Sequence, residues 1–319
     1  MKKKLRLGII APSAVVGQIE LKLGTEILRD AGFEVVVHPQ CRKRHRFFAG
    51  SDEERARAFF DFARDPSIDA LWCARGGYGA ARLLPLLDRL TRAKGKPPRK
   101  LLLGYSDALA VNTFARERWG WRAIHAAMPG TREFLRVSDE DRQATFRFVR
   151  GDTAGSSRKL RWISRKPGQD VRGELVGGNL CVLVSLLGTP SFPDLKGKIL
   201  FLEEIDEGLY RVDRMVEQLL QSGALRGVKA LVLGDFSGCE DKVVRVLKKP
   251  TLDPKPTDLK ALRPLLNHRS ELPLIFGRLA EHYGFPLADG FPAGHGDRKY
   301  PLLLGGTYRL SRMGLLEFA

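Results

Sequence analysis

The sequence contains few cysteines and no long apolar run. Its four cysteines, at positions 41, 73, 181 and 239, form no CxxC pair and have no metal-ligand spacing, and a chain of 319 residues can fold without disulfides. We therefore expect free thiols in a reducing compartment. The apolar runs, as at residues 101–103 and 199–202, are far shorter than the roughly 20 residues of a membrane-spanning helix. The sequence thus predicts a protein with no membrane partner.

Acidic residues are also scarce beside basic ones. The chain has 37 Asp and Glu against 54 Lys and Arg, a formal net charge of +17. Basic residues gather in three runs, at residues 41–46, 92–100 and 158–166, but none carries the interleaved aromatic residues of a nucleic-acid-binding module. We expect a solvated basic surface that attracts acidic substrates, with no nucleic-acid partner. The alternative of another class is a basic protein that binds anionic ligands without catalysis.

The first residues combine a basic start with an apolar stretch, a pattern that also occurs in secretion signals. Here Arg6 interrupts the apolar stretch, and Pro12 and Ser13 follow it directly. A first β-strand that runs into a Pro-Ser loop explains the pattern better. Together with the free thiols, this predicts a cytoplasmic protein.

Strand-length apolar runs alternate with helical patterns in the first half of the chain. Strands are predicted at residues 5–11, 33–38, 70–74 and 100–103, and helices at residues 18–31, 52–65, 79–90 and 107–118. This alternation predicts a parallel, doubly wound α/β sheet, in which chemistry gathers at the carboxyl ends of the strands.

The second half of the chain is less regular. Strands are predicted at residues 173–176, 198–203 and 230–233 and near residues 301 and 308, and helices at residues 179–187, 210–222 and 274–283. A polar, Gly- and Ser-rich stretch separates the halves and is typical of a linker. We therefore divide the chain into an N-terminal domain (residues 1–150), a linker (151–170) and a C-terminal domain (171–319).

Ser106 lies in the segment 104–107 (Gly-Tyr-Ser-Asp), between a strand and a helical pattern. This is the place of a nucleophile elbow, a sharp turn that exposes a serine hydroxyl near the helix N-terminus, although the trailing Gly of GxSxG is missing. The alternative is that Ser106 or Asp107 only caps the helix.

A second turn, residues 75–79 (Arg-Gly-Gly-Tyr-Gly), follows the preceding strand and fits neither a dinucleotide fingerprint nor a P-loop. Its glycines allow a close backbone approach to a ligand, and Arg75 is a candidate partner for a substrate carboxylate.

His295 stands between two glycines in a loop without periodicity, so it is displayed as a general base would be. The alternative is a solvated surface histidine. His125 is the next candidate among the six histidines. An acid that orients the base can come from the strand that ends in Glu203 and Glu204, which alternation places on opposite faces. Periodicity alone does not choose between these two glutamates. No histidine or carboxylate cluster has the spacing of a metal site, so we predict no metal and no cofactor.

Five motifs, in this order and spacing, resemble the LD-carboxypeptidase family over nearly the whole chain. They are residues 75–79, residues 104–107, residues 177–180 (Gly-Gly-Asn-Leu), residues 199–204 (Ile-Leu-Phe-Leu-Glu-Glu) with residues 210–215, and residues 294–296 (Gly-His-Gly). The resemblance implies an N-terminal flavodoxin-like domain that carries the nucleophile and a C-terminal β-rich swivelling domain that carries acid and base. It also implies a triad of Ser106, Glu203 and His295.

The same resemblance implies a cytoplasmic serine carboxypeptidase, expected as a homodimer, that removes the terminal D-alanine of murein tetrapeptides in cell-wall recycling. We expect the oxyanion to be held by backbone N–H groups of Asp107 and of Gly76 or Gly77. Candidates for substrate binding are Arg75, Tyr78, Asn179 and His125. The family commonly has a Thr-His-Gly-Pro type segment where this chain has residues 124–130 (Ile-His-Ala-Ala-Met-Pro-Gly), a difference expected to affect the substrate pocket more than the triad. The alternative within the family is an amidase of the microcin-immunity type, which cleaves a peptidyl-nucleotide or a similar conjugate.

Overall fold

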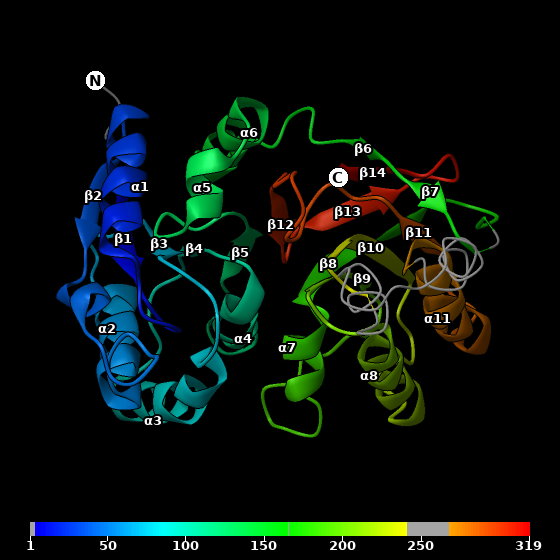
Figure 1. Cartoon of the computed structure of the whole chain (residues 1–319), viewed down its shortest axis with the longest axis horizontal. Helices are drawn as coiled ribbons and strands as arrows, with labels where there is room; N and C mark the ends of the chain where they lie inside the picture. Colours follow the sequence, from blue (N-terminus) through cyan, green and yellow to red (C-terminus); the bar gives the residue numbers. More distant parts are fainter. Residues whose placement is uncertain (1–3, 165, 241–267) are drawn as a thin grey trace, which may run out of the picture.

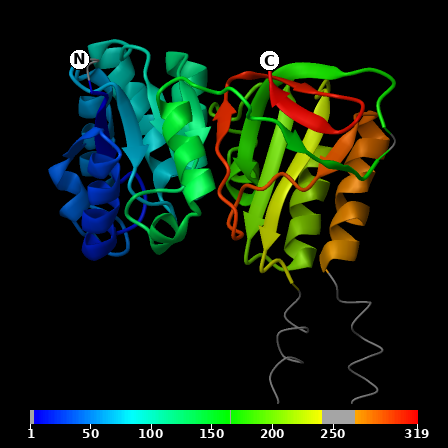
Figure 2. The ribbon, with the colours of Figure 1, turned by 90° about the horizontal axis from the view of Figure 1, so that it is seen from above.

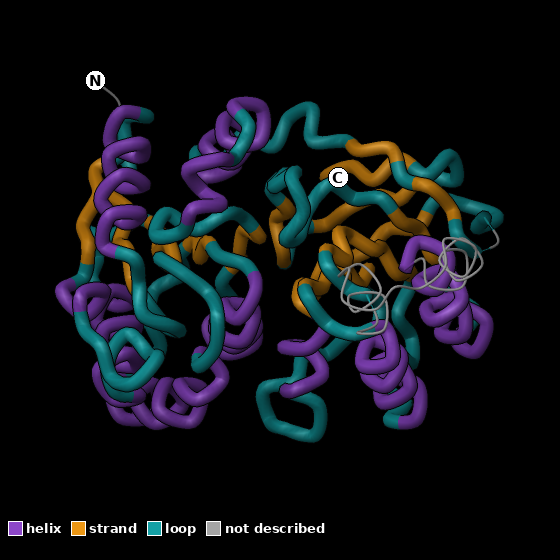
Figure 3. Tube along the Cα trace, viewed as in Figure 1, coloured by secondary structure: helices purple, strands orange, loops and turns teal. Residues whose placement is uncertain are grey.

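Two α/β units lie side by side in the molecule, the first formed by the N-terminal half of the chain and the second by the C-terminal half (Figures 1 and 2). The computed structural model describes residues 4–164, 166–240 and 268–319. Each unit is built on one β-sheet, and helices cover these sheets (Figure 3).

Among the described residues, the N-terminal sheet has six strands in the order β12-β5-β4-β3-β1-β2. Five of them are parallel, and β12 joins antiparallel at the edge. The parallel order 2-1-3-4-5 is the flavodoxin-like order, which confirms the predicted fold class of this half. The strands are β1 (Arg6–Ile10), β2 (Glu34–Val37), β3 (Ala70–Cys73), β4 (Leu101–Leu103), β5 (Arg122–His125) and β12 (Leu302–Leu304).

Helices cover both faces of this sheet, with α1, α5 and α6 on one face and α2, α3 and α4 on the other (Figure 1). The sequence sets the starts of several of them: Ser51 and Glu54 form a capping box at the start of α2, whose Phe59 and Phe60 are buried in the core. The elements are α1 (Gln18–Asp30), η1 (Pro39–Arg42), α2 (Asp52–Arg64), η2 (Ala80–Leu83), α3 (Leu84–Lys94), η3 (Ser106–Ala108), α4 (Leu109–Phe114), the π-helical η4 (Ala115–Trp119), α5 (Arg132–Arg136) and α6 (Asp139–Val149).

In the part of the chain that the structure describes, the C-terminal sheet has eight strands in the order β6-β14-β13-β8-β9-β10-β11-β7. The central strands β8 to β11 are parallel, and antiparallel strands flank them on both sides. The strands are β6 (Arg158–Lys159), β7 (Arg161–Trp162), β8 (Val171–Asn179), β9 (Ile199–Ile205), β10 (Ala230–Ser237), β11 (Leu287–Asp289), β13 (Thr307–Leu310) and β14 (Leu315–Phe318). The helices α7 (Leu180–Ser185), α8 (Leu209–Gln221) and α11 (His268–Tyr283) pack together against one face.

The structure differs from the sequence prediction where the two halves join. The expected linker, residues 151–170, contains β6 and β7, which pair with β14 and β11 at the two edges of the C-terminal sheet. Edge strands need only main-chain hydrogen bonds on one side, so polar residues form them readily and their composition resembles that of a linker. Near the C-terminus, β12 leaves the C-terminal unit and pairs with β5 of the first sheet. The loop that precedes β12 therefore runs between the two units.

Candidate active site

Ser106 sits at the tip of a sharp turn directly after β4. Its φ is 61°, a left-handed conformation that a serine rarely adopts, and the preceding Gly104 has a φ of 154°. A Cβ at Gly104 would lie 3.0 Å from the Cβ atoms of Ala108 and Cys73, so the turn needs glycine there. This is the strand-to-helix elbow expected from the sequence, and η3 begins at Ser106 itself.

The Gly-rich turn after β3 lies against Ser106. A Cβ built on Gly76 would be 3.1 Å from both Cβ and Oγ of Ser106, so a larger residue at this position would crowd the hydroxyl. Gly77 has a φ of 100°. The structure thus brings together the two loops that the sequence singled out at the carboxyl edge of the first sheet.

The side chain of Asp107 ties these loops together. Its Oδ2 accepts hydrogen bonds from Oγ of Ser13, at 2.6 Å, and from the backbone N–H of Ala80, at 2.8 Å. Burial raises the pKa of Asp107 above its ordinary value, and these hydrogen bonds oppose the rise. Asp107 therefore fixes the loop after β1 and the Gly-rich turn relative to the nucleophile elbow.

His295 and Glu203 form the central contact of the second unit. Nδ1 of His295 lies 2.7 Å from Oε2 of Glu203, whose side chain is fully buried in β9. Burial by itself would raise the pKa of Glu203, but the imidazoles of His125 and His295 outweigh it and lower the pKa to about 2. The glutamate is thus a permanent anion beside the histidine ring.

Tyr105 links the two units at this point. Its buried ring, next to Ser106 in the chain, lies 4.7 Å from the His295 ring and 5.3 Å from the His125 ring, measured between centroids. Tyr105 therefore places the elbow of the first unit against the histidine of the second. The elbow that carries Ser106 and the pair of His295 and Glu203 therefore lie on the two sides of the junction between the units, although they come from distant parts of the chain.

The structure also separates the two glutamates at the end of β9. Glu203 faces the first unit, whereas Glu204 accepts hydrogen bonds from the Asn179 side chain at 2.8 Å and from the backbone N–H of Cys181 at 2.7 Å. Burial raises the pKa of Glu204. Asn179 also caps α7 by accepting from Val182 N–H, so its burial is explained by contacts within the protein. Its role in substrate binding stays a prediction.

Sequence reasoning missed the residues that hold the His295 loop. Asp235, in β10, accepts from the backbone N–H of Gly296 at 3.1 Å. On the other side, Asp141 of α6 binds Arg298 through two hydrogen bonds of 2.7 and 2.9 Å and accepts from Lys299 N–H at 2.8 Å. The one available signal was the Gly-Asp pair at 234–235 that follows an apolar run; nothing marked Asp141, because its partner lies 157 positions away in the sequence.

Two other candidates lie on the exposed rim of the Gly-rich turn. Arg75 is exposed, donates to the carbonyl of Val15 and lines a pocket of about 310 Å³ together with Glu20, Arg132 and Glu133. Tyr78 is 54% exposed and contacts the rings of Phe47 and Phe48. Both remain predicted substrate contacts.

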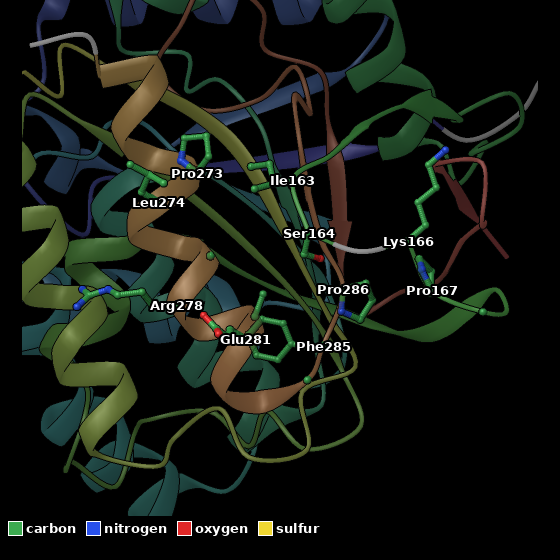
Figure 4. A pocket seen from close by; sticks show the side chains of 14 residues that line it. Ile163, Ser164, Lys166, Pro167, Pro273, Leu274, Arg278, Glu281, Phe285 and Pro286 are labelled. Carbon is green, nitrogen blue, oxygen red and sulfur yellow. The ribbon is translucent and has the colours of Figure 1, made fainter. Parts of the chain in front are cut away.

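A separate hollow lies far from these loops in the chain, between α11 and the segment after β7 (Figure 4). It has a volume of about 940 Å³ and is lined by residues such as Ile163, Leu274 and Phe285, with none of the predicted site residues.

Among the residues that the structure describes, no group of histidine, cysteine or acidic side chains has a metal-binding arrangement. In the same residues, no helix is long and apolar enough to span a bilayer.

One unit carries a serine on a strained elbow, and the other carries a histidine paired with a buried carboxylate; this arrangement is typical of a two-domain serine hydrolase. The comparison with known families specifies it: residues 7–126 match the LD-carboxypeptidase N-terminal domain, and residues 172–310 match the LD-carboxypeptidase C-terminal domain. The chain therefore belongs to the LD-carboxypeptidase family, as the motifs indicated.

Similar proteins support this membership. A murein tetrapeptide carboxypeptidase of Pseudomonas aeruginosa is 31% identical over 93% of this chain and 90% of its own length. A probable murein peptide carboxypeptidase of Bacillus subtilis is 32% identical over 73% of this chain and 72% of its own. The crystal structure of a muramoyltetrapeptide carboxypeptidase from Oxalobacter formigenes superimposes with a TM-score of 0.76 at 31% identity and covers 98% of both chains.

Proposed function

We propose that the protein is a murein tetrapeptide carboxypeptidase that releases the terminal D-alanine, with Ser106 as nucleophile, His295 as general base and Glu203 as the acid that orients it. The observation that carries this proposal is the 2.7 Å contact between His295 and the fully buried Glu203, with Tyr105 holding the His295 ring beside the elbow. The substrate class rests on the similarity of the chain to the murein carboxypeptidases of Pseudomonas aeruginosa and Bacillus subtilis and to the muramoyltetrapeptide carboxypeptidase of Oxalobacter formigenes.

Acylation begins when Nε2 of His295 takes the proton of the Ser106 hydroxyl and Oγ attacks the carbonyl carbon of the bond before D-alanine. Glu203 accepts from Nδ1–H, which keeps Nε2 unprotonated and then stabilises the imidazolium. The carbonyl oxygen becomes an oxyanion, held by backbone N–H groups at Asp107 and at Gly76 or Gly77. The imidazolium then gives its proton to the amine as the C–N bond breaks, and D-alanine leaves.

Deacylation repeats these steps with water. His295 takes a proton from water, the hydroxide attacks the ester carbonyl, and Ser106 recovers its proton as the shortened peptide leaves. The two loops tied by Asp107 keep the oxyanion donors fixed through both half-reactions.

Acidic groups of a muropeptide suit the basic character of the chain. The pocket beside the Gly-rich turn is lined by Arg75 and Arg132 and also by Glu20 and Glu133, and Arg132 pairs with Glu20 at 3.2 Å. We expect Arg75 to take one of the free carboxylates, with Tyr78 on the same rim. A protein with this role would act on recycled wall fragments in the cytoplasm, as a homodimer.

The test is a panel of peptides analysed by mass spectrometry. We expect loss of one alanine from a murein tetrapeptide that ends in D-alanine, and no cleavage of the same peptide ending in L-alanine or of a pentapeptide with a terminal D-Ala-D-Ala bond. A protein that leaves all murein peptides intact but cleaves an aminoacyl or peptidyl sulfamoyl nucleoside would instead be an amidase of the microcin-immunity type. This conjugate belongs in the panel because the chain is also similar to the Escherichia coli microcin C7 self-immunity protein, at 24% identity over 74% of this chain.

A further inference from the structure

His125 occupies a place that the reaction outlined above does not use. It ends β5 in the first sheet, is only 3% exposed, and packs edge-on against Phe201 of β9. The sequence suggested a substrate contact for this residue. The structure places it instead against the carboxylate of Glu203.

His125 and Glu203 face each other with one unsatisfied atom each. Nε2 of His125 lies 3.8 Å from Oε1 of Glu203, and neither atom has a hydrogen-bond partner among the described residues. The distance is beyond a hydrogen bond, and it is too short for a bridging water, which would hold the two atoms roughly 5 Å apart. Buried polar atoms without partners are costly, so a shift of less than about 1 Å that joins them is favoured.

This pair crosses the boundary between the two units. His125 belongs to the nucleophile domain and Glu203 to the C-terminal sheet, while the second carboxylate oxygen, Oε2, is already held by His295. The strand that follows the His295 loop also pairs with β5, with Leu302 opposite His125. A small approach of the units therefore changes the His125 contact and the position of His295 together.

We infer that His125 is a positioning residue, which donates a hydrogen bond from Nε2 to Oε1 of Glu203 in the reactive state and so fixes the acid and base of one domain against the serine of the other. It touches neither substrate nor the reacting atoms. The inference deepens the proposed acyl-transfer function and rests on it, but it concerns the activation of Ser106 and not the choice of substrate.

Other charged groups surround the pair and contribute to the pH dependence of the labelling rate. Glu204, Asp235 and Lys299 act on Glu203 electrostatically, and Tyr105 contacts both histidine rings. These groups are unchanged in the variants below. A shift between variants therefore reports the His125 contact.

The experiment measures how fast an alkyl fluorophosphonate labels Ser106 as a function of pH, beside tetrapeptide turnover. In His125→Phe the ring remains but the donor is lost, so we expect labelling and kcat to fall at least about tenfold, as for a charged acceptor that loses one hydrogen bond. KM should stay close to the wild-type value. Without the donor, Glu203 acts more strongly on His295, so the acid limb of the rate should move to higher pH.

Two further variants separate the donor from packing. The amide of His125→Gln reaches the place of Nε2 and should restore most of the rate and the wild-type acid limb, whereas His125→Asn is too short and should behave like the phenylalanine variant. His282→Phe, an exposed histidine on α11, is the matched control.

The inference would be overturned if His125→Phe were labelled as fast as the wild type and showed the same acid limb in its pH profile. So would equal losses in the glutamine and asparagine variants, which would mean that only the shape of His125 matters. If the wild type is labelled at Ser106 but leaves the tetrapeptide intact, the proposed substrate fails and the labelling series still decides the role of His125. No labelling of Ser106 in the wild type would overturn both.

Discussion

Replacing Glu203 by glutamine tests how much of the rate depends on the buried anion. The change keeps the shape of the side chain in β9, removes its charge and turns one acceptor oxygen into an N–H donor. In the wild type, Oε2 lies 2.7 Å from Nδ1 of His295, and the side chain is fully buried, so solvent does not screen the pair.

The magnitude follows from the contact between Glu203 and His295. The pKa of Glu203 is lowered to about 2 from an ordinary 4.5 although burial opposes ionisation, so the carboxylate is charged when the imidazolium forms. A hydrogen bond to a charged group contributes about 1.5–3 kcal/mol, so losing it slows the reaction about 10- to 10²-fold. A wrong tautomer of His295 would increase the loss toward the ~10⁴-fold effect of the equivalent change in serine proteases.

The assay is the pH dependence of kcat/KM for tetrapeptide cleavage in Glu203→Gln. Without the neighbouring negative charge the His295 imidazolium is less stable, so the acid limb should move to lower pH, opposite to the shift expected for His125→Phe. Glu204→Gln, one residue along the same strand, is the matched control and should stay within about tenfold of the wild type. Activity in the Glu203 variant within threefold of wild type, or a smaller loss than in the Glu204 variant, would refute the assignment of the acid.

Three other changes test the surrounding structure. Gly76→Ala places a methyl group 3.1 Å from Oγ of Ser106, so kcat should fall at least about 10²-fold while the circular dichroism spectrum stays unchanged. The control Gly168→Ala meets nothing within 4 Å and should be active. Equal activities of the two variants would contradict the close approach of Gly76 to Ser106. Asp141→Asn removes the carboxylate that binds Arg298, and urea unfolding should show a loss of about 1–3 kcal/mol at pH 7. Burial opposes ionisation of Asp141, but pairing with Arg298 lowers the pKa of this carboxyl from the ordinary 3.8. The pairing therefore stabilises the protein fully above about pH 3.8, and this stabilisation is lost as the pH falls further. The stabilities of wild type and variant should converge in acid, and a constant difference down to pH 2 would refute the pairing. Asp235→Asn loosens the loop at Gly296, so we expect a lower kcat with little change in KM, and a changed KM alone would count against this role.

Much of the N-terminal half was predictable because its elements are strongly periodic. The predicted strand at residues 5–11 and the predicted helix at residues 52–65 agree with β1 and α2 to within one residue at each end. The nucleophile elbow was equally visible, since a Gly-x-Ser turn between strand and helix is a local feature. By contrast β5, α5 and α6 went unpredicted, although β5 carries His125.

Features that depend on distant parts of the chain were not predictable. Alternation placed Glu203 and Glu204 on opposite faces but could not show which face meets the first domain, and only the contact with His295 separates them. The return of β12 to the first sheet, and the clamp of Asp141 on Arg298, join segments more than 150 residues apart. The helix expected over residues 107–118 is in fact a 3₁₀ turn, a short α-helix and a π-turn, variants of helical hydrogen bonding that apolar periodicity does not distinguish.

The most direct measurement compares wild type, Ser106→Ala and Ser185→Ala by mass spectrometry after incubation with a murein tetrapeptide. Ser185 is exposed on α7 and serves as the control serine. The account predicts that wild type and Ser185→Ala release one D-alanine, while Ser106→Ala releases none although it is folded and still binds the peptide. Release of D-alanine by Ser106→Ala at the wild-type rate would contradict the central claim that Ser106 is the nucleophile.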